Sequence, residues 1–196
     1  MTITISAPVD TQRPPRERIL AVARDLFYRY GIHDVGVDAI AEAAGTNKMT
    51  LYRHFESKDE LVAECLRRLA GELEAKWVAI AAAHHGDPLG QLRGWLRFLG
   101  EFKMSERGCA MANAAIELPD HDHPAHRVIA AAKKLHHEKL LELCRAAGLE
   151  EPGLVADQIF LLCEGARASL QSVGPNGPGA RLVEMLQSLV TRHAPR

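Results

Sequence analysis

The sequence predicts an all-α protein, and three observations support this fold class. Apolar residues recur every three or four positions through most of the 196 residues, which is the period of an amphipathic helix. No alternating pattern typical of a β-strand occurs after residue 10. Glycine and proline divide the chain into segments of helical length. A composition of 47% hydrophobic and 25% charged residues is typical of a globular protein with a sizeable core.

The first helix is expected to begin at Pro14 or Pro15 and to end at Gly31. Proline suits the first turn of a helix, where its missing N–H would be unpaired. Glycine readily adopts the left-handed conformation that ends a helix. Between these ends, one apolar stripe contains Ile19, Leu20, Ala23, Leu26, Phe27 and Tyr30. Residues 1–12 show no period and are expected to form a flexible N-terminal arm.

Two short helices joined by a tight turn are expected over Val37–Phe55. Gly45 ends the first helix because of its conformational freedom. Asn47 is placed to cap the second helix with its side-chain oxygen. The residues of the first helix that share an apolar face are Val37, Ile40, Ala41 and Ala44. This spacing favours a compact helix-turn-helix unit.

The second of these helices, Lys48–Phe55, is too short to be stable alone. Its side chains are mostly polar, and Met49, Leu51 and Phe55 are the residues available to anchor it. A short helix that is held by its neighbours and presents hydrogen-bond donors is typical of a helix-turn-helix that reads DNA. With the first helix of the chain, it predicts a three-helix DNA-binding head.

A long helix is expected from Ser57 to about Ala83. Ser57 and Glu60 have the spacing of a capping box, in which Ser57 caps the helix and Glu60 reaches back. One side of the helix carries Leu61, Cys65, Leu69, Leu73, Trp77 and Ile80. A helix of this length spans about 40 Å, so it suits a strut between the head and the rest of the chain.

Glycine and proline also delimit the C-terminal helices. These are expected at residues 88–105, 110–118, 123–147, 152–173 and 180–193, with a turn-rich loop at 174–179. The sequence therefore predicts three parts. They are the arm at 1–12, a helix-turn-helix DNA-binding domain at 13–60, and an effector-binding and dimerisation domain at 61–196.

Residues 44–61, AGTNKMTLYRHFESKDEL, resemble the DNA-binding signature of the TetR family of repressors. The resemblance extends from about Arg16 to Leu66, roughly a quarter of the chain. The sequence departs from the family pattern at Gly36, where Ser or Thr is usual, and at Met49, where a small residue is common. The resemblance implies a homodimer with a C-terminal ligand-binding domain.

Base contacts are expected from the start of the second motif helix and phosphate contacts from its flanks. The groove candidates are Thr46, Asn47, Lys48, Thr50 and Leu51, with Leu51 equally an anchor. The resemblance implies phosphate contacts at Tyr52, His54 and Lys58. The net charge of −1 and the pI of about 6.8 mean that DNA binding depends on a few well-placed cations and not on a basic domain.

The segment 152–173 is apolar almost all round, which predicts burial on both sides. With the last helix it is expected to form a four-helix dimer interface, as the resemblance implies. The expected interface residues are Leu154, Ile159, Leu162, Ala166, Leu170, Leu182, Met185, Leu186 and Leu189. A central core helix of a monomer is the alternative.

An apolar effector pocket is expected in the C-terminal domain. Its candidate residues, each of which could instead be ordinary core, are Trp77, Trp95, Phe98, Phe102, Met111, Asn113 and Phe160. The predicted function is a homodimeric repressor that a small apolar or amphipathic effector releases from a palindromic double-stranded DNA operator. The alternative is a small-molecule-binding or enzymatic helical protein whose head no longer binds DNA.

Other function classes find little support in the sequence. No GxSxG, Walker loop or GxGxxG occurs, so neither an enzyme nor a cofactor is predicted. Asp120, His121, Asp122, His123 and His126 could bind a metal, but loops and helix caps use the same residues, and no metal site is predicted. Four separated cysteines, no signal peptide and no long apolar run predict free thiols, a cytoplasmic protein and no membrane contact.

Overall fold

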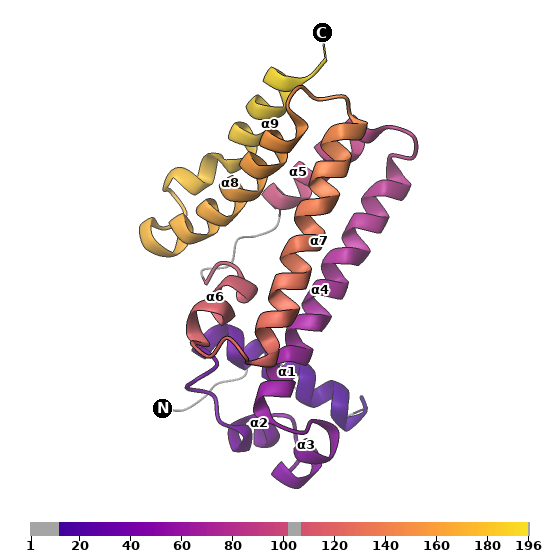
Figure 1. Cartoon of the computed structure of the whole chain (residues 1–196). Helices are drawn as coiled ribbons and strands as arrows, with labels where there is room; N and C mark the ends of the chain where they lie inside the picture. Colours follow the sequence, from indigo (N-terminus) through magenta and orange to yellow (C-terminus); the bar gives the residue numbers. More distant parts are fainter. Residues whose placement is uncertain (1–11, 102–106, 196) are drawn as a thin grey trace. The chain divides into compact units, whose positions relative to one another are not determined.

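The computed structural model describes residues 12–101 and 107–195, and these residues form helices and no strand (Figure 1). The all-α prediction is confirmed. The helices are α1 (Pro15–Tyr30), α2 (Val37–Ala43), α3 (Lys48–His54), α4 (Lys58–Ala83), α5 (Pro88–Glu101), α6 (Ala110–Glu117), α7 (Pro124–Ala146), α8 (Pro152–Val173), the 3₁₀ helix η1 (Pro178–Arg181) and α9 (Leu182–His193). No described helix is long and apolar enough to cross a membrane.

Proline and glycine set most of the helix ends as expected. α1 begins at Pro15, and Gly31 follows it with a φ of 90°. α8 has the predicted bounds. One end differs, because the predicted loop at 174–179 runs into η1, so α9 begins at Leu182 and not at residue 180. The expected arm, apart from its last residue, and the expected end of α5 lie outside the described residues.

One of the two hydrogen bonds of the expected capping box forms at the start of α4. The Ser57 hydroxyl accepts a hydrogen bond from the backbone N–H of Glu60 at 3.0 Å. The Glu60 carboxylate does not turn back to Ser57, however. It accepts a hydrogen bond from the Arg67 guanidinium at 2.8 Å, and the same guanidinium also donates to Glu64. An ion pair along the helix has therefore replaced the second bond of the capping box.

The chain divides into two compact units, and each is described by itself. Unit 1 contains the N-terminal part through Ala70 together with Ala110–Ala130, and unit 2 contains Gly71–Cys109 with the chain from Ala131 onward. α4 and α7 each contribute residues to both units. The expected functional boundary near residue 60 stays a prediction.

The core of unit 1 gathers apolar residues of the three head helices and of the start of α4. Its fully buried side chains include Ile19, Leu26, Ile40, Leu51 and Leu61. α1 packs against α2 and α3, and α2 packs against α3. Two helices as short as α2 and α3 are stable only through such packing.

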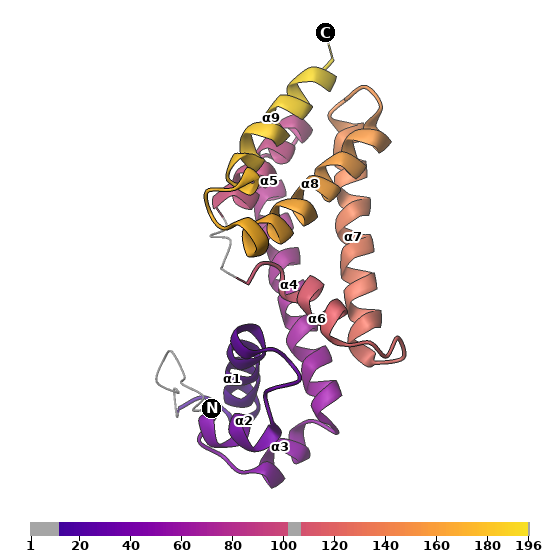
Figure 2. The same ribbon diagram turned by 90° about the vertical axis from the view of Figure 1, so that its left-hand side faces the viewer.

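The core of unit 2 lies among α4, α5, α7, α8 and α9. Its fully buried residues include Trp95, Leu140, Ile159 and Leu186. α9 packs against α5 and α8, and the views in Figures 1 and 2 agree on this arrangement. Burial raises the pKa of the Cys144 and Cys163 thiols to about 11, so both remain protonated core residues. All four cysteines of the chain are free, as predicted.

Candidate nucleic-acid interface

α2, the turn after it and α3 form a helix-turn-helix (Figure 2). Gly45 has a φ of 61°, the left-handed conformation that ends α2. The backbone N–H of Thr46 then donates to Ala41 O at 2.9 Å. Asn47 caps α3 as expected, because its Oδ1 accepts from the backbone N–H of Thr50 at 2.8 Å. The start of α3 is thereby fixed by local hydrogen bonds.

The Arg18 side chain on α1 holds this turn in place. Its guanidinium donates to Ala44 O at 3.1 Å and to Gly45 O at 3.2 Å. These two carbonyls stand at the end of α2, where helical partners are missing. A single cation from α1 therefore binds two carbonyls at the C-terminus of α2 and holds the turn that leads to α3. Sequence reasoning missed this role, because the contact joins residues 26 positions apart.

The buried side of α3 is smaller than expected. Leu51 is fully buried and Phe55 is 3% exposed, so both anchor the helix. The Arg16 guanidinium lies 5.2 Å from the centre of the Phe55 ring. Leu51 was also predicted to reach the DNA groove, and its burial rules that out. Met49 was predicted as an anchor, but its side chain is 83% exposed and lies on the outer surface of α3.

The remaining groove candidates and the phosphate candidate Tyr52 lie in α3 and in the two residues before it. Asn47, Lys48 and Tyr52 are exposed, and Thr46 and Thr50 are half-buried. Lys48 is paired, since its Nζ donates to Asp38 Oδ2 at 3.0 Å, and this bond raises the pKa of Lys48. Lys48 is therefore fully charged at neutral pH, and it must exchange Asp38 for any contact with DNA.

Two further phosphate candidates are the last residue of α3 and the first residue of α4. His54 is half-buried, and its Nε2 has no hydrogen-bond partner among the residues that the structure describes. Lys58, the first residue of α4, is also half-buried. Desolvation lowers the pKa of Lys58, and the carboxylates of Asp59, Asp34 and Glu117 oppose that shift. An anion that approached Lys58 would stabilise its charge, as a phosphate at a helix N-terminus does.

The segment from α6 to α7 is bonded to the head within unit 1. The backbone N–H of Ile32 donates to Glu117 Oε2 at 2.5 Å, and His33 Nε2 lies 2.6 Å from Glu117 O. Gly31 makes room for this carboxylate, because a Cβ there would lie 3.0 Å from Glu117 Oε2. His123 Nε2 lies 3.4 Å from Asp59 Oδ1 at the start of α4. Glu117 thus binds the chain just before α2, and His123 lies near the start of α4, just after α3.

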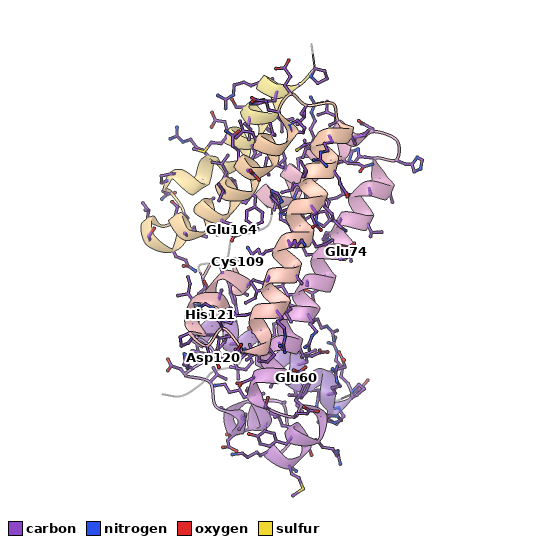
Figure 3. All side chains as sticks on the ribbon, viewed as in Figure 1. Glu60, Glu74, Cys109, Asp120, His121 and Glu164 are labelled. Carbon is purple, nitrogen blue, oxygen red and sulfur yellow. The ribbon has the colours of Figure 1, made fainter. Side chains whose placement is uncertain are left out.

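Local hydrogen bonds engage the side chains of the Asp- and His-rich loop at 120–126. Asp120 and His121 of this loop are labelled in Figure 3. His123 Nδ1 accepts from the backbone N–H of Ala125 at 3.1 Å, and His126 Nε2 lies 2.7 Å from Leu118 O. Asp120 Oδ1 accepts from the backbone N–H of Asp122 at 2.9 Å. Within the described residues, no three His, Cys, Asp or Glu side chains are arranged to hold a metal ion.

Comparisons with known proteins agree with this geometry. Residues 19–65 match the model of the bacterial regulatory proteins of the tetR family. A TetR-family regulator structure from Streptomyces avermitilis has a TM-score of 0.76 and 31% identity, covering 92% of this chain and 98% of that chain. The chain belongs to the TetR family. The regulator SCO4454 from Streptomyces coelicolor has a TM-score of 0.83 at 28% identity, covering 92% of this chain and 96% of that one.

The curated relatives match over a shorter length and differ in the sense of regulation. The transcriptional activator FasR of Mycolicibacterium smegmatis is 43% identical over 27% of this chain and 24% of its own length. The transcriptional repressor KstR2 of Rhodococcus jostii is 38% identical over 35% of this chain and 33% of its own length. The chain therefore aligns with about a quarter to a third of each. Family membership does not by itself decide between repression and activation.

The pocket candidates of this TetR-family chain fall in different units. Trp77, Trp95, Phe98 and Phe160 belong to unit 2, where Trp77 and Trp95 stack with ring centres 3.8 Å apart. Met111, which is buried, and Asn113, which is half-buried, lie on α6 in unit 1. Phe102 lies outside the described residues.

His136 on α7 completes the aromatic group in unit 2, and sequence reasoning did not place it there. Its ring centre lies 5.6 Å from that of Trp77, 5.3 Å from that of Trp95 and 6.0 Å from that of Phe160. These four residues with Phe98 are called the tryptophan cluster below. Burial, with the nearby charges of Arg167 and Lys133, lowers the pKa of His136 to about 4, so its ring is neutral at pH 7.

Acidification is expected to destabilise the chain through His136. Its pKa is about 4 when folded and near 6.5 when unfolded, so the unfolded state binds more protons between these values. The free energy of unfolding should therefore fall as the pH drops through this window, by on the order of 3 kcal/mol. Urea denaturation at about pH 7 and about pH 4.5 should show a smaller loss for His136→Leu than for the native chain. Equal losses would contradict this role.

The predicted dimer residues divide into core and surface. Ile159 and Leu186 are fully buried within the chain, so they stabilise unit 2 itself and do not reach a partner. Leu154 is 47% exposed, and Leu162 and Leu170 are half-buried. An open groove of about 830 Å³ lies between α8 and α9. The predicted residues that line it are Leu162, Ala166, Leu182, Met185 and Leu189.

Leu161 also lines this groove and was missed by sequence reasoning. Its side chain is 66% exposed, more than that of any predicted interface residue. Gly165 is exposed on the same helix and would allow another helix to approach closely. The groove thus combines an exposed leucine, a small residue and the edge of the α8–α9 contact.

Proposed function

We propose that this chain is a homodimeric transcriptional repressor that binds a palindromic operator and is released by a small apolar or amphipathic effector. The observation that carries the proposal is how α3 is anchored and which side chains it exposes. Leu51 and Phe55 anchor one side, Asn47 caps its start, and Arg18 fixes the turn before it. The opposite side presents Lys48 and Tyr52 to solvent. A rigidly held helix with exposed donors is the arrangement that base readout in a major groove requires.

The charge distribution supports DNA binding through a few lysines at defined positions. The chain carries 24 Lys and Arg against 25 Asp and Glu, so it has no general excess of positive charge. Lys48 and Lys58 stand at the starts of α3 and α4, where helix N-termini also favour anions. The bond between Lys48 and Asp38 keeps this charge partly neutralised until DNA displaces the carboxylate.

The groove between α8 and α9 supports a dimer through a second copy of the same surface. Leu161 and Met185 expose apolar area there that association would remove from water. A two-fold dimer would carry two α3 helices. Two such helices bind half-sites about one turn of DNA, or about 34 Å, apart. A palindromic operator follows from that symmetry.

Regulation is proposed to act on the spacing of the two heads. α4 carries Lys58 at its first residue and Trp77 near its end, so a shift at the tryptophan cluster can be transmitted along a continuous helix. Glu117 and His123 supply a second connection to the head. An effector that binds better to a state with the wrong spacing lowers operator affinity by its differential affinity for the two states.

Small-molecule binding by this fold has structural precedent. A putative regulator from Saccharomonospora viridis, with a TM-score of 0.73 and 19% identity, was solved in complex with choline. That ligand belongs to that protein, and it supports only the proposal that this chain also binds a small molecule. Because its proposed target is a DNA operator, we propose that the chain acts in the cytoplasm.

Selection of binding sites from a random pool of duplex DNA tests the proposal. The native chain should enrich a palindromic sequence and retard it in a gel at nanomolar to micromolar concentrations. Enrichment of no sequence would favour the alternative, a small-molecule-binding or enzymatic protein whose head is no longer used. Placing the enriched site upstream of a reporter gene then distinguishes repression from activation.

Two variants should weaken operator binding without changing its sequence preference. Tyr52→Phe removes an exposed hydroxyl donor, and Lys58→Ala removes a cation at the start of α4. Each should lower operator affinity roughly tenfold, and Lys58→Ala should also lower the slope of log affinity against log salt by about one. Lys134→Ala, an exposed lysine on α7, is the matched control and should change neither quantity. Native affinity in both head variants would refute these contacts.

A further inference from the structure

Met49, the second residue of α3, has the most exposed large apolar side chain among the described residues. It is 83% exposed, whereas Leu51, two residues on, is fully buried. Successive residues of an α-helix are rotated by about 100°, so side chains two residues apart point in nearly opposite directions. Met49 therefore lies opposite the side by which α3 is anchored, on the side that would face the DNA.

The other side chains at the start of α3 are already engaged or partly covered. Asn47 Oδ1 accepts from the backbone N–H of Thr50 at 2.8 Å, so this side chain serves as the helix cap. Lys48 Nζ donates to Asp38 Oδ2 at 3.0 Å. Thr50 is half-buried. The N-terminal residues of a recognition helix contact base edges, and Met49 can approach one without giving up a hydrogen bond or an ion pair.

Cationic side chains lie on both sides of Met49 along α3. Lys48 precedes it, and Arg53 is exposed four residues further on, which places it on the same side of the helix as Met49. The first turn of α3 contains no acidic residue. A single exposed apolar side chain is ordinary on a protein surface. This one, however, lies between two cations at the end of α3 that would enter the groove, so its surroundings suit DNA.

The chemistry of the base edges decides what Met49 would contact. In the major groove, all four bases present hydrogen-bond donors or acceptors, and thymine also presents an apolar C5-methyl group. A thioether side chain placed against a polar edge removes water from a donor or acceptor and offers no hydrogen bond of comparable strength. Against the thymine methyl group, it removes apolar area of both partners from water. Methionine is unbranched and flexible, so it can adjust to the position of that methyl group.

We infer that Met49 contacts the C5-methyl group of a thymine in each half-site of the operator and so selects a T·A pair at that position. The inference rests on the proposed DNA-binding function and adds a specificity-determining residue to it. The chain has Met49 where the family signature commonly has a small residue, so this contact belongs to this chain in particular.

Replacement of thymine by uracil tests the contact, because uracil pairs as thymine does and lacks only the C5-methyl group. Each thymine of the operator selected by the native chain is replaced in turn, first in one half-site and then symmetrically in both. Fluorescence anisotropy gives the affinity of the full chain for each duplex. At one position, uracil should weaken binding about fourfold in one half-site and about fifteenfold in both, because one buried methyl group is lost per half-site.

Two substitutions of Met49 separate a methyl contact from a general effect on binding. Met49→Leu keeps an apolar side chain and should retain most of the uracil effect at this position. Met49→Gln has a polar side chain of similar length, so it should remove the uracil effect there, and a repeated selection should no longer enrich thymine at that position. Tyr52→Phe is the matched control, because it should weaken all duplexes alike and leave the uracil effect unchanged. Circular dichroism verifies that every variant is folded.

The outcomes separate this inference from the proposed function. If the native chain binds an operator but uracil weakens binding at no position, or if the selected half-site contains no enriched thymine, Met49 does not read thymine. The inference is equally wrong if folded Met49→Gln keeps the uracil effect at every position. In each of these cases operator binding itself stands. If no duplex is selected or bound, the proposed function fails and this inference falls with it.

Discussion

Leu161→Arg is expected to convert the dimer to monomers and to reduce operator affinity by about a hundredfold or more. Leu161 is 66% exposed in the groove between α8 and α9. In a dimer through this groove, two arginines would enter an interface where Arg181 and Arg192 already outnumber the one lining carboxylate, Glu184. Burying an unpaired charge at an interface costs several kcal/mol, and the two-fold symmetry doubles that cost. The isolated chain should remain folded, because the substituted side chain is exposed there.

Sedimentation equilibrium at micromolar concentration measures this effect. The native chain should have a mass about twice 21.5 kDa, and Leu161→Arg should have the mass of one chain. Leu135→Arg is the matched control, since Leu135 is a 45% exposed leucine on α7 that does not line the groove. A control that also dissociates would place the interface elsewhere. A native chain that is monomeric at high concentration would refute the proposed dimer.

Lys48→Ala and Asp38→Asn are expected to change operator affinity in opposite directions. Lys48 Nζ and Asp38 Oδ2 are 3.0 Å apart and both side chains are largely exposed. Removing Lys48 should lower operator affinity roughly tenfold and relax the sequence preference at the position that it contacts. Removing the charge of Asp38 frees Lys48 and reduces repulsion of phosphates, so affinity should rise several-fold, most strongly at low salt.

Fluorescence anisotropy with the selected operator and with a scrambled duplex measures both changes. Asp38→Asn should strengthen binding to the two duplexes nearly equally, because it acts through charge. Lys48→Ala should weaken the operator more than the scrambled duplex. The double variant should bind between Lys48→Ala and the native chain, because removing the charge of Asp38 still reduces repulsion of phosphates. A shift in the same direction for both single variants would contradict the exchange of Asp38 for DNA.

The sequence predicted the local features of the fold and of the head. Pro15, Gly45 and Pro152 delimit helices through their own backbone preferences, and the Asn47 cap acts over three residues. Such features need only a short stretch of sequence. This is why most helix bounds and the turn of the helix-turn-helix were expected correctly.

Features that depend on distant contacts were missed or misassigned. The clamp by Arg18 joins residues 26 positions apart, and the bond from Ile32 to Glu117 joins residues 85 apart. Met49 was expected to anchor α3 and is exposed, because a helix of seven residues is too short for periodicity to fix its buried side. Because α8 is apolar almost all round, its sequence likewise did not reveal that Ile159 lies in the core and Leu161 on the surface.

Hydroxyl-radical footprinting of the native chain on the selected operator tests the central claim most directly. The account expects one dimer to protect two symmetric half-sites whose centres lie about one helical turn, or about 34 Å, apart on one face of the DNA. The same footprint with Leu161→Arg should be absent at concentrations that saturate the native protein. A single protected half-site bound by one chain, or uniform protection without a preferred sequence, would contradict the account of a dimeric operator-binding regulator.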